Sequence, residues 1–423
     1  MDSFAETKSN ETDGKYRIYQ SPEFLLIKHM DYNKYLQFDL LNSNACTEVT
    51  KEALGEIVLT ESKVCPLAII GVMKIDKWSL LVYVNAHEVI GKINNKEIYT
   101  IKEIDFIPIT NEQFTFTTEI KYYLDGLKTL MHTGFYYSFE YDLTMSLQAS
   151  KNPKQDSKQF LESQYYNYNY NLKKVLLDLG VNTIFTNCNL INGYVGIQSA
   201  DLNGENVDLI LISRRSRFMA GTLFNCKGID LNGDTANFVE TEQIMKIGNK
   251  YFSFVIYRGS QPLLLKADKS NYENTTKINE ELSCEVLSKS VVAKHIEKLS
   301  LKEKFNVFLI NLLSDNIEKE SILNKHIQNS LFPTQTSTGG ICRLTRFDFK
   351  NTLITYEGND FTMLENFANR FISSQNSDIL YYCEDTKFKS SIPQKGIIRV
   401  NCLNSLDRTN IMQAALCWKV CET

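Results

Sequence analysis

The sequence lacks the patterns that mark a metal site or a dinucleotide site. The chain of 423 residues has ten cysteines but no Cys-x-x-Cys pair, and its five histidines have no ligand spacing with the cysteines. A zinc site is therefore not expected. Glycines 193, 221, 228 and 233 do not form a dinucleotide fingerprint. We expect no cofactor.

Long hydrophobic runs are also missing. The longest one, around residues 66–73, is far shorter than the roughly 20 residues that a membrane helix needs. The N-terminus is polar and acidic, which does not fit a signal peptide. We therefore expect no transmembrane segment in this chain. The scattered cysteines fit a reducing compartment.

The chain has no excess of positive charge. Its formal net charge is −4, which argues against a protein that binds nucleic acid through its overall charge. A local basic patch for a phosphate or an anionic lipid remains compatible with this balance. The Tyr and Asn run at residues 165–171 lacks the interleaved basic residues of a nucleic-acid stacking platform. We expect that run to be a surface linker.

What is present is typical of a folded protein of two to three domains. Hydrophobic residues make up 43% and charged residues 23% of the chain. Residues 1–14 are expected to be a disordered tail. Residues 15–178 are expected to form a mostly β module with a linker near 150–171, because short β-branched runs recur between polar turns. Residues 179–423 alternate strand and helix signals, which predicts an α/β architecture.

The predicted elements follow from these local patterns. The expected strands cover residues 23–28, 67–73, 79–84, 208–213, 252–257, 304–309 and 396–401. The expected helices cover residues 112–133, 172–179, 290–299, 317–328, 362–374 and 409–420.

The clearest functional motif is the segment RVNCLNSLDRTN at residues 399–410, which is predicted to run from a strand through a loop into a helix. Such a loop directs backbone N–H groups inward, and the helix N-terminus adds partial positive charge. An anion the size of a phosphate fits such a site. The residues of the predicted phosphate-binding loop are Leu403, Asn404, Ser405 and Leu406.

Four side chains of this segment are candidate catalytic residues. Cys402 is the candidate nucleophile, since the same field favours its thiolate. Arg408 can bind two phosphoryl oxygens at once. Thr409 can hydrogen-bond the sulfur, and Asp407 can protonate the leaving oxygen. The reaction would pass through a phosphocysteine that water then hydrolyses.

A simpler interpretation competes with this one. A Cys-x5-Arg pair often occurs by chance, and a free cysteine is usually a small buried hydrophobe. The strand before the motif, the helix after it and the sequence Asp-Arg-Thr-Asn favour the catalytic interpretation. The candidate accessory residues are Asn401, Asn410, Arg214 and Arg217. Buried pairs with Glu240 and Glu242 are an equally good explanation for the arginines.

The motif resembles the signature RxNCxDCLDRTN of the SAC-domain phosphoinositide phosphatases, from which it differs at two fixed positions. The resemblance extends over about residues 60–420. It is carried by GFYYSFEYDLTMSLQ at 134–148, INGYVGI at 191–197, the block at 211–230, ANFVETEQI at 236–244, RGSQP at 258–262 and RFDF at 346–349.

The resemblance implies an N-terminal SAC module packed on a catalytic domain with a Cys-x5-Arg P-loop. It implies a phosphoinositide substrate, most of all phosphatidylinositol 4-phosphate, and no metal. It also implies peripheral contact with the cytosolic face of endoplasmic reticulum and Golgi membranes. Protein partners are not identified by it. The family usually continues beyond the point where this chain ends, so the chain is either naturally short or a fragment.

Several positions depart from the family pattern. Asn404 stands where the family has Asp, and Ser405 where it has a second Cys. Met219, Leu223 and Cys226 replace arginines, and Lys350 replaces a histidine. These substitutions leave open a catalytically silent lipid-binding or scaffold protein. A protein tyrosine phosphatase shares the Cys-x5-Arg logic but not the other blocks.

Overall fold

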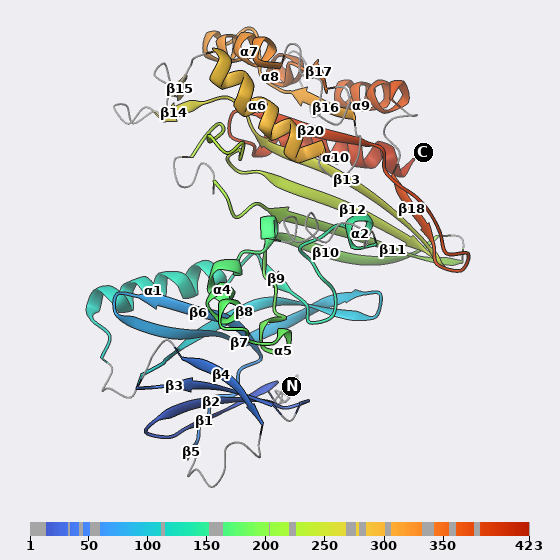
Figure 1. Cartoon of the computed structure of the whole chain (residues 1–423). Helices are drawn as coiled ribbons and strands as arrows, with labels where there is room; N and C mark the ends of the chain where they lie inside the picture. Colours follow the sequence, from blue (N-terminus) through green and yellow to red (C-terminus); the bar gives the residue numbers. More distant parts are fainter. Residues whose placement is uncertain are drawn as a thin grey trace, which may run out of the picture. The chain divides into compact units, whose positions relative to one another are not determined.

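The computed structural model describes residues 14–32, 34–41, 45–50, 60–110, 115–151, 164–202, 204–219, 226–267, 276–278, 285–300, 306–331, 342–354, 361–375 and 381–422. Their contacts divide the chain into two compact units (Figure 1). One unit lies within residues 1–142 and 169–190, and the other within 143–168 and 191–423. The assignment of one unit as a SAC module and of the other as a catalytic domain stays a prediction.

The first unit is built mainly from antiparallel strands. One sheet has the order β4-β3-β2-β1-β5 and a second part has the order β9-β8-β7-β6. The strands are β1 Tyr16–Gln20, β2 Phe24–His29, β3 Lys34–Asp39, β4 Cys46–Thr50, β5 Thr60–Glu61, β6 Ala68–Ile75, β7 Trp78–Ile93, β8 Lys96–Pro108 and β9 Phe135–Tyr137. The helices are α1 Thr118–Met131, α4 Tyr170–Asp178 and α5 Thr183–Thr186.

Apolar side chains that alternate along these strands form the core of this unit. Ile18, Ile27 and Leu36 from one sheet pack against Ile69 and Leu81 from the other, and all are almost fully buried. This alternation is the period-2 pattern of half-buried antiparallel strands. The mostly β prediction for the N-terminal region is therefore confirmed.

The second unit contains a sheet of the order β17-β16-β20-β13-β12-β11-β10. Its strands are β10 Ile191–Leu202, β11 Glu205–Arg215, β12 Val239–Ile247, β13 Lys250–Ser260, β16 Asn306–Asn311, β17 Cys342–Arg346 and β20 Gly396–Cys402. Short strands β14 Leu265–Ala267 and β15 Thr276–Ile278 pair with each other, and β18 Tyr382–Asp385 and β19 Ser390–Ile392 extend from β13. Strands β17, β16, β20 and β13 are parallel, whereas β13 to β10 are antiparallel.

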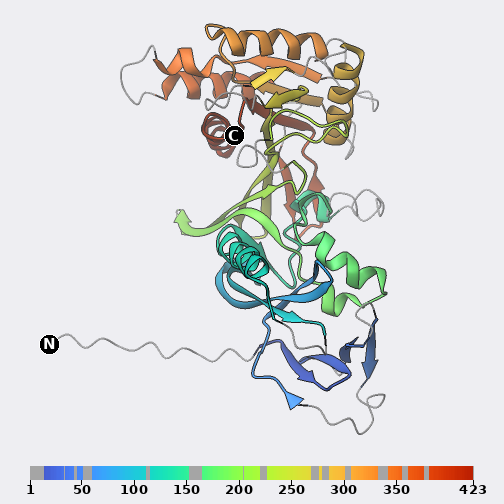
Figure 2. The ribbon, with the colours of Figure 1, turned by 90° about the vertical axis from the view of Figure 1, so that its left-hand side faces the viewer.

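Helices surround the parallel part of this sheet, as Figures 1 and 2 both show. They are α6 Glu285–Ser300, α7 Glu318–Leu331, α8 Phe349–Ile354, α9 Thr362–Ser374 and α10 Asp407–Cys421. The short helix α2 Leu147–Ser150 lies beside the antiparallel strands instead, where the Leu147 N–H donates to Glu242 of β12. Helices α9 and α10 pack with Ile256 and Ile398 in one core, while α6 packs with Val255 and Leu309 in another. Both faces of the parallel strands are thus covered, as a parallel sheet requires. The predicted α/β class is confirmed, with strands predominating.

The strands and helices expected in this unit are found close to the predicted bounds. Residues 1–13 of the expected tail and 152–163 of the expected linker lie outside the described residues. The surface position predicted for the Tyr and Asn run was wrong, since Tyr166 and Asn169 are buried. The Asn169 side chain donates to Ile70 O and Cys188 O, so its amide satisfies buried backbone groups.

Candidate active site

Cys402 is the last residue of β20, between two parallel neighbours. It lies opposite Ser260 of β13, and the preceding Asn401 lies opposite Asn311 of β16. The Cys402 side chain is buried in the core beneath α10. Residues 403–406 form the loop between β20 and α10, so the sulfur lies where a strand, a short loop and a helix N-terminus meet. This is the local structure that the sequence predicts.

The loop backbone is held by donors from β13 and from the segment before β12. Ser260 Oγ donates to Leu403 O at 2.7 Å. Asn237 Nδ2 donates to Asn404 O at 3.2 Å and to Ser405 O at 2.8 Å. Because a trans peptide directs its C=O and N–H to opposite sides, binding the carbonyls turns the following N–H groups the other way. The N–H of Ser405 accordingly donates to Cys402 Sγ at 3.1 Å.

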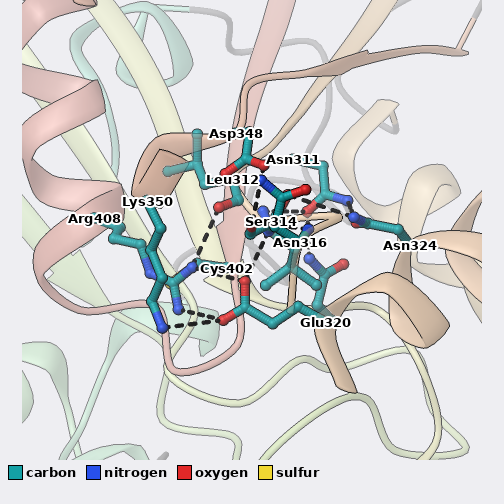
Figure 3. Close-up of polar contacts among 12 residues, drawn as sticks. Asn311, Leu312, Ser314, Asn316, Glu320, Asn324, Asp348, Lys350, Cys402 and Arg408 are labelled. Atoms are coloured by element: carbon teal, nitrogen blue, oxygen red, sulfur yellow. Dashed lines mark hydrogen bonds and ion pairs between the residues drawn. The ribbon is translucent and has the colours of Figure 1, made fainter. Parts of the chain in front are cut away.

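Arg408 lies in the first turn of α10 and contacts an acidic side chain of α7 (Figure 3). Its Nη1 and Nη2 donate to the two carboxylate oxygens of Glu320 at 3.2 and 3.0 Å, and Nη1 also donates to Leu312 O at 3.3 Å. Burial lowers the pKa of Arg408, but the hydrogen bonds and charge of Glu320 raise it more, so the net shift is upward. The guanidinium is charged under all ordinary conditions.

The other predicted residues of the motif occupy different environments. Asp407 is exposed in the first turn of α10, and Asn410 is exposed one turn later. The Thr409 hydroxyl is buried and donates to Leu406 O at 2.7 Å. This hydroxyl therefore binds the loop backbone rather than the sulfur of Cys402. Asn404 Oδ1 is buried and has no hydrogen-bond partner among the described residues.

The two accessory arginines are engaged away from Cys402. Arg214 is fully buried and forms ion pairs with Glu240 at 2.9 Å and with Glu242 at 2.6 Å. The structural interpretation of these three residues is thereby confirmed. Arg217 donates through Nε to Gln164 O at 2.7 Å and stacks over the ring of Phe218.

Sequence reasoning did not single out the arginine that contacts the loop, which is Arg258. Arg258 of β13 donates from Nη1 to Ser405 O at 2.6 Å. Arg215 lies in the same register row, because Val239 of β12 pairs with both Arg215 and Arg258. Burial, and then the charge of Arg215, lower the pKa of Arg258 to about 10. The position of Arg258 in the RGSQP block was the available signal, although nothing in the block identifies its partner.

Buried polar networks support the ends of β16 and β20. Asn311 Oδ1 accepts from Asn401 Nδ2 at 3.0 Å, and Asn311 Nδ2 donates to Asn324 Oδ1 at 2.6 Å. Arg399, fully buried, donates to His295 Nε2 at 2.9 Å and to Ser260 O at 2.7 Å. Burial lowers the pKa of Arg399 to about 9 and that of His295 well below its usual range. Through its hydrogen bond to Asn311, Asn401 orients the end of β20 below the loop.

Comparison with known proteins shows the family to which the chain belongs. The model of the SacI homology domain matches residues 67–354. This chain belongs to the SacI homology family. The match covers most of both units and ends before the Cys402 segment, whose geometry is described above.

Curated SacI relatives align over much of the chain. Phosphoinositide phosphatase SAC7 of Arabidopsis thaliana is 24% identical over 98% of this chain and 68% of its own length. Phosphatidylinositol-3-phosphatase SAC1-A of Danio rerio is 24% identical over 95% of this chain and 68% of its own. Polyphosphatidylinositol phosphatase INP53 of Saccharomyces cerevisiae is 31% identical over 68% of this chain, which spans 26% of that protein.

Among the described residues, no helix is both long and apolar enough to cross a bilayer.

Proposed function

We propose that this chain is a phosphoinositide phosphatase that removes a monoester phosphate from the inositol ring through a phosphocysteine on Cys402. The observation that carries the proposal is the contact of Cys402 Sγ with the N–H of Ser405, in the loop directly before α10. A thiolate is stabilised by such a donor and by the helix N-terminus. The names of the SacI relatives support the substrate class.

In the first step, the Cys402 thiolate attacks phosphorus as the bond to the inositol oxygen breaks. Asp407 gives its proton to that oxygen, and its exposure at the first turn of α10 leaves it accessible to a bound substrate. Arg408 and the loop N–H groups stabilise the charge on the three remaining phosphoryl oxygens. These groups together form the proposed P-loop.

In the second step, water attacks the phosphocysteine. The bond between sulfur and phosphorus breaks, the thiolate is restored, inorganic phosphate leaves, and the water proton passes to Asp407. Asn404 Oδ1, which has no partner among the described residues, is a hydrogen-bond acceptor that can orient this water. An amide orients water but does not accept its proton, so Asp407 is the one carboxylate of residues 399–410 that can do so, and we expect hydrolysis to be the slower step.

The proposed substrate is phosphatidylinositol 4-phosphate, with the chain bound peripherally at the cytosolic face of endoplasmic reticulum or Golgi membranes. Arg258 beside the loop, with Arg215 in its register row on β11, supplies positive charge for an anionic headgroup. We expect sedimentation with vesicles to be weak and to decrease with salt, because exposed charges are screened. Vesicle binding that resists high salt would contradict this.

A second candidate function is a catalytically silent lipid-binding or scaffold protein. It is favoured by Asn404 and Ser405, which leave Asp407 as the only carboxylate of the loop. Such a protein would keep the anion site without turnover.

Phosphate release by the purified chain separates these functions. The substrates are short-chain phosphatidylinositol 4-phosphate, 3-phosphate and 4,5-bisphosphate, each with wild type and Cys402→Ser. We expect release to be fastest from the 4-phosphate and absent in the variant. Faster release from the 3-phosphate would correct the ring position alone. Lipid binding without any release would replace the enzyme by the scaffold.

A further inference from the structure

Glu320 lies at the first turn of α7, 88 residues before Arg408, yet it is the main partner of that guanidinium. Its side chain is 6% exposed, and both carboxylate oxygens accept from Arg408. Figure 3 shows the two side chains meeting edge to edge near Cys402. Lys350 Nζ approaches Glu320 Oε1 at 3.8 Å from the solvent side. The carboxylate thus has two cations around it.

The pairing uses only one edge of the guanidinium. Arg408 binds Glu320 and Leu312 O through Nη1 and Nη2. Its Nε has no hydrogen-bond partner in the part of the chain that the structure describes. A guanidinium is a rigid planar group with five donors, and its Nε–Nη2 edge matches two oxygens of a phosphate as well as its terminal edge does. One edge is therefore held while the other remains available.

Glu320 is itself fixed from its own side. The N–H of Ser314 donates to Glu320 Oε2 at 2.8 Å, and Ser314 Oγ donates to Asp348 Oδ2 at 2.8 Å. Asn324 Nδ2 donates to Asp315 Oδ1 at 2.8 Å and anchors the same turn to α7. A carboxylate restrained in this way restrains the orientation of whatever binds both of its oxygens.

We infer that Glu320 is a positioning residue of the reaction: it holds Arg408 by the terminal edge so that the Nε–Nη2 edge faces the phosphate on Cys402. This inference rests on the proposed function. Glu320 does not touch the substrate, and its negative charge alone would repel a phosphate. Its contribution is orientation, which matters most in the transition state.

The test compares Glu320→Gln with Glu318→Gln. Glu318 is an exposed residue of the same helix turn, so its variant removes the same charge without touching Arg408. We expect Glu320→Gln to lower kcat by about 10²-fold, the typical scale for a misplaced group, with KM raised by no more than about tenfold. Glu320→Asp should recover part of this loss. Glu318→Gln should match wild type.

A double-mutant cycle separates positioning from a structural role. In an Arg408→Lys background, Glu320→Gln should lower kcat by no more than about threefold further, because the group that it positions is already gone. Equal losses in both backgrounds would overturn the inference. So would a rise in kcat for Glu320→Gln, which would make the ion pair inhibitory.

A binding measurement keeps this inference distinct from the proposed function. The probe is inorganic phosphate, titrated calorimetrically into wild type, Glu320→Gln, Arg408→Lys and the double variant. Glu320→Gln alone should weaken phosphate binding about tenfold relative to wild type. Added to Arg408→Lys, it should leave the phosphate affinity of that variant unchanged. If no phosphoinositide is turned over but this pattern holds, the enzyme proposal fails and the positioning role stands. The positioning role is overturned if Glu320→Gln binds phosphate as tightly as wild type does, or if wild type does not bind phosphate.

Discussion

Two arginines of the second unit bind carboxylates, but they use their donors differently. Arg214 is fully buried, and Nε, Nη1 and Nη2 all donate to Leu143 O, Met145 O, Glu240 or Glu242. Arg408 is partly exposed and binds one carboxylate through its terminal edge. An arginine whose donors are all used inside the protein stabilises the fold. An arginine with one edge available beside a nucleophile can bind a substrate.

The largest expected effect is that of substituting Cys402, the proposed nucleophile. Cys402→Ser should abolish phosphate release while leaving the thermal midpoint within a few degrees, since a serine hydroxyl stays protonated where a thiol ionises. The measurement is phosphate release together with thermal unfolding. Turnover at the wild-type rate in Cys402→Ser would refute the phosphocysteine mechanism.

Substitution of Arg408 and of Arg214 tests most directly whether the two arginines have different roles. Arg408→Lys should lower kcat/KM by about 10³-fold with little change in stability. The reason is that the ammonium group of lysine cannot bind two phosphoryl oxygens side by side as the planar guanidinium does. Arg214→Met should leave two buried carboxylates without their cation and lower the free energy of unfolding by about 3–5 kcal/mol. Urea unfolding and initial rates of both variants test this contrast. If Arg408→Lys lost stability, or if Arg214→Met kept the stability of wild type, the two arginines would not differ in role as stated.

Asp407→Asn tests the exposed acid next to Arg408. It should slow release from an inositol lipid by about 10²–10⁴-fold, because the leaving alkoxide needs a proton. An aryl phosphate has a better leaving group and should lose much less. Rates on both substrates decide the matter, and equal losses on the two would assign Asp407 another role.

The reversion Asn404→Asp should have a smaller effect, in the opposite direction. We expect lipid turnover to rise several-fold through faster hydrolysis of the phosphocysteine, because a carboxylate activates water better than an amide. Ser405→Cys should change little, since a second thiol mainly offers a reversible disulfide. Burst kinetics separate the two steps. An unchanged steady-state rate in Asn404→Asp would show that Asn404 does not limit hydrolysis.

The smallest effect is a pH dependence of stability beneath the site. His295 lies buried against Arg399, and burial followed by the charge of Arg399 lowers its pKa. A histidine with a depressed pKa in the folded state binds a proton first in the unfolded state. The free energy of unfolding should therefore fall as pH drops below about 6.5, by up to about 1.4 kcal/mol per pH unit. Denaturant unfolding of wild type and His295→Gln at pH 5–8 measures the difference, and identical slopes would contradict it.

Local segments of this site could be predicted from the sequence, but its long-range contacts could not. The strand, loop and helix around Cys402 follow from periodicity over about 20 residues. One donor to Ser405 O comes from Arg258, 147 residues earlier, and the partner of Arg408 comes from α7. No local pattern encodes such distant pairings. The Tyr and Asn run was misinterpreted because composition shows the polarity of Asn169 but not the buried backbone groups that it binds.

The central claim is that phosphate is transferred to Cys402 beside an arginine with an available edge. Rapid acid quench of wild type with a phosphate-labelled short-chain phosphoinositide tests it most directly. Since Asn404 slows hydrolysis in this account, we expect label on Cys402 approaching one per chain within the first turnover, and much less in Arg408→Lys. Steady phosphate release without protein-bound label, or label on another residue, would contradict the account.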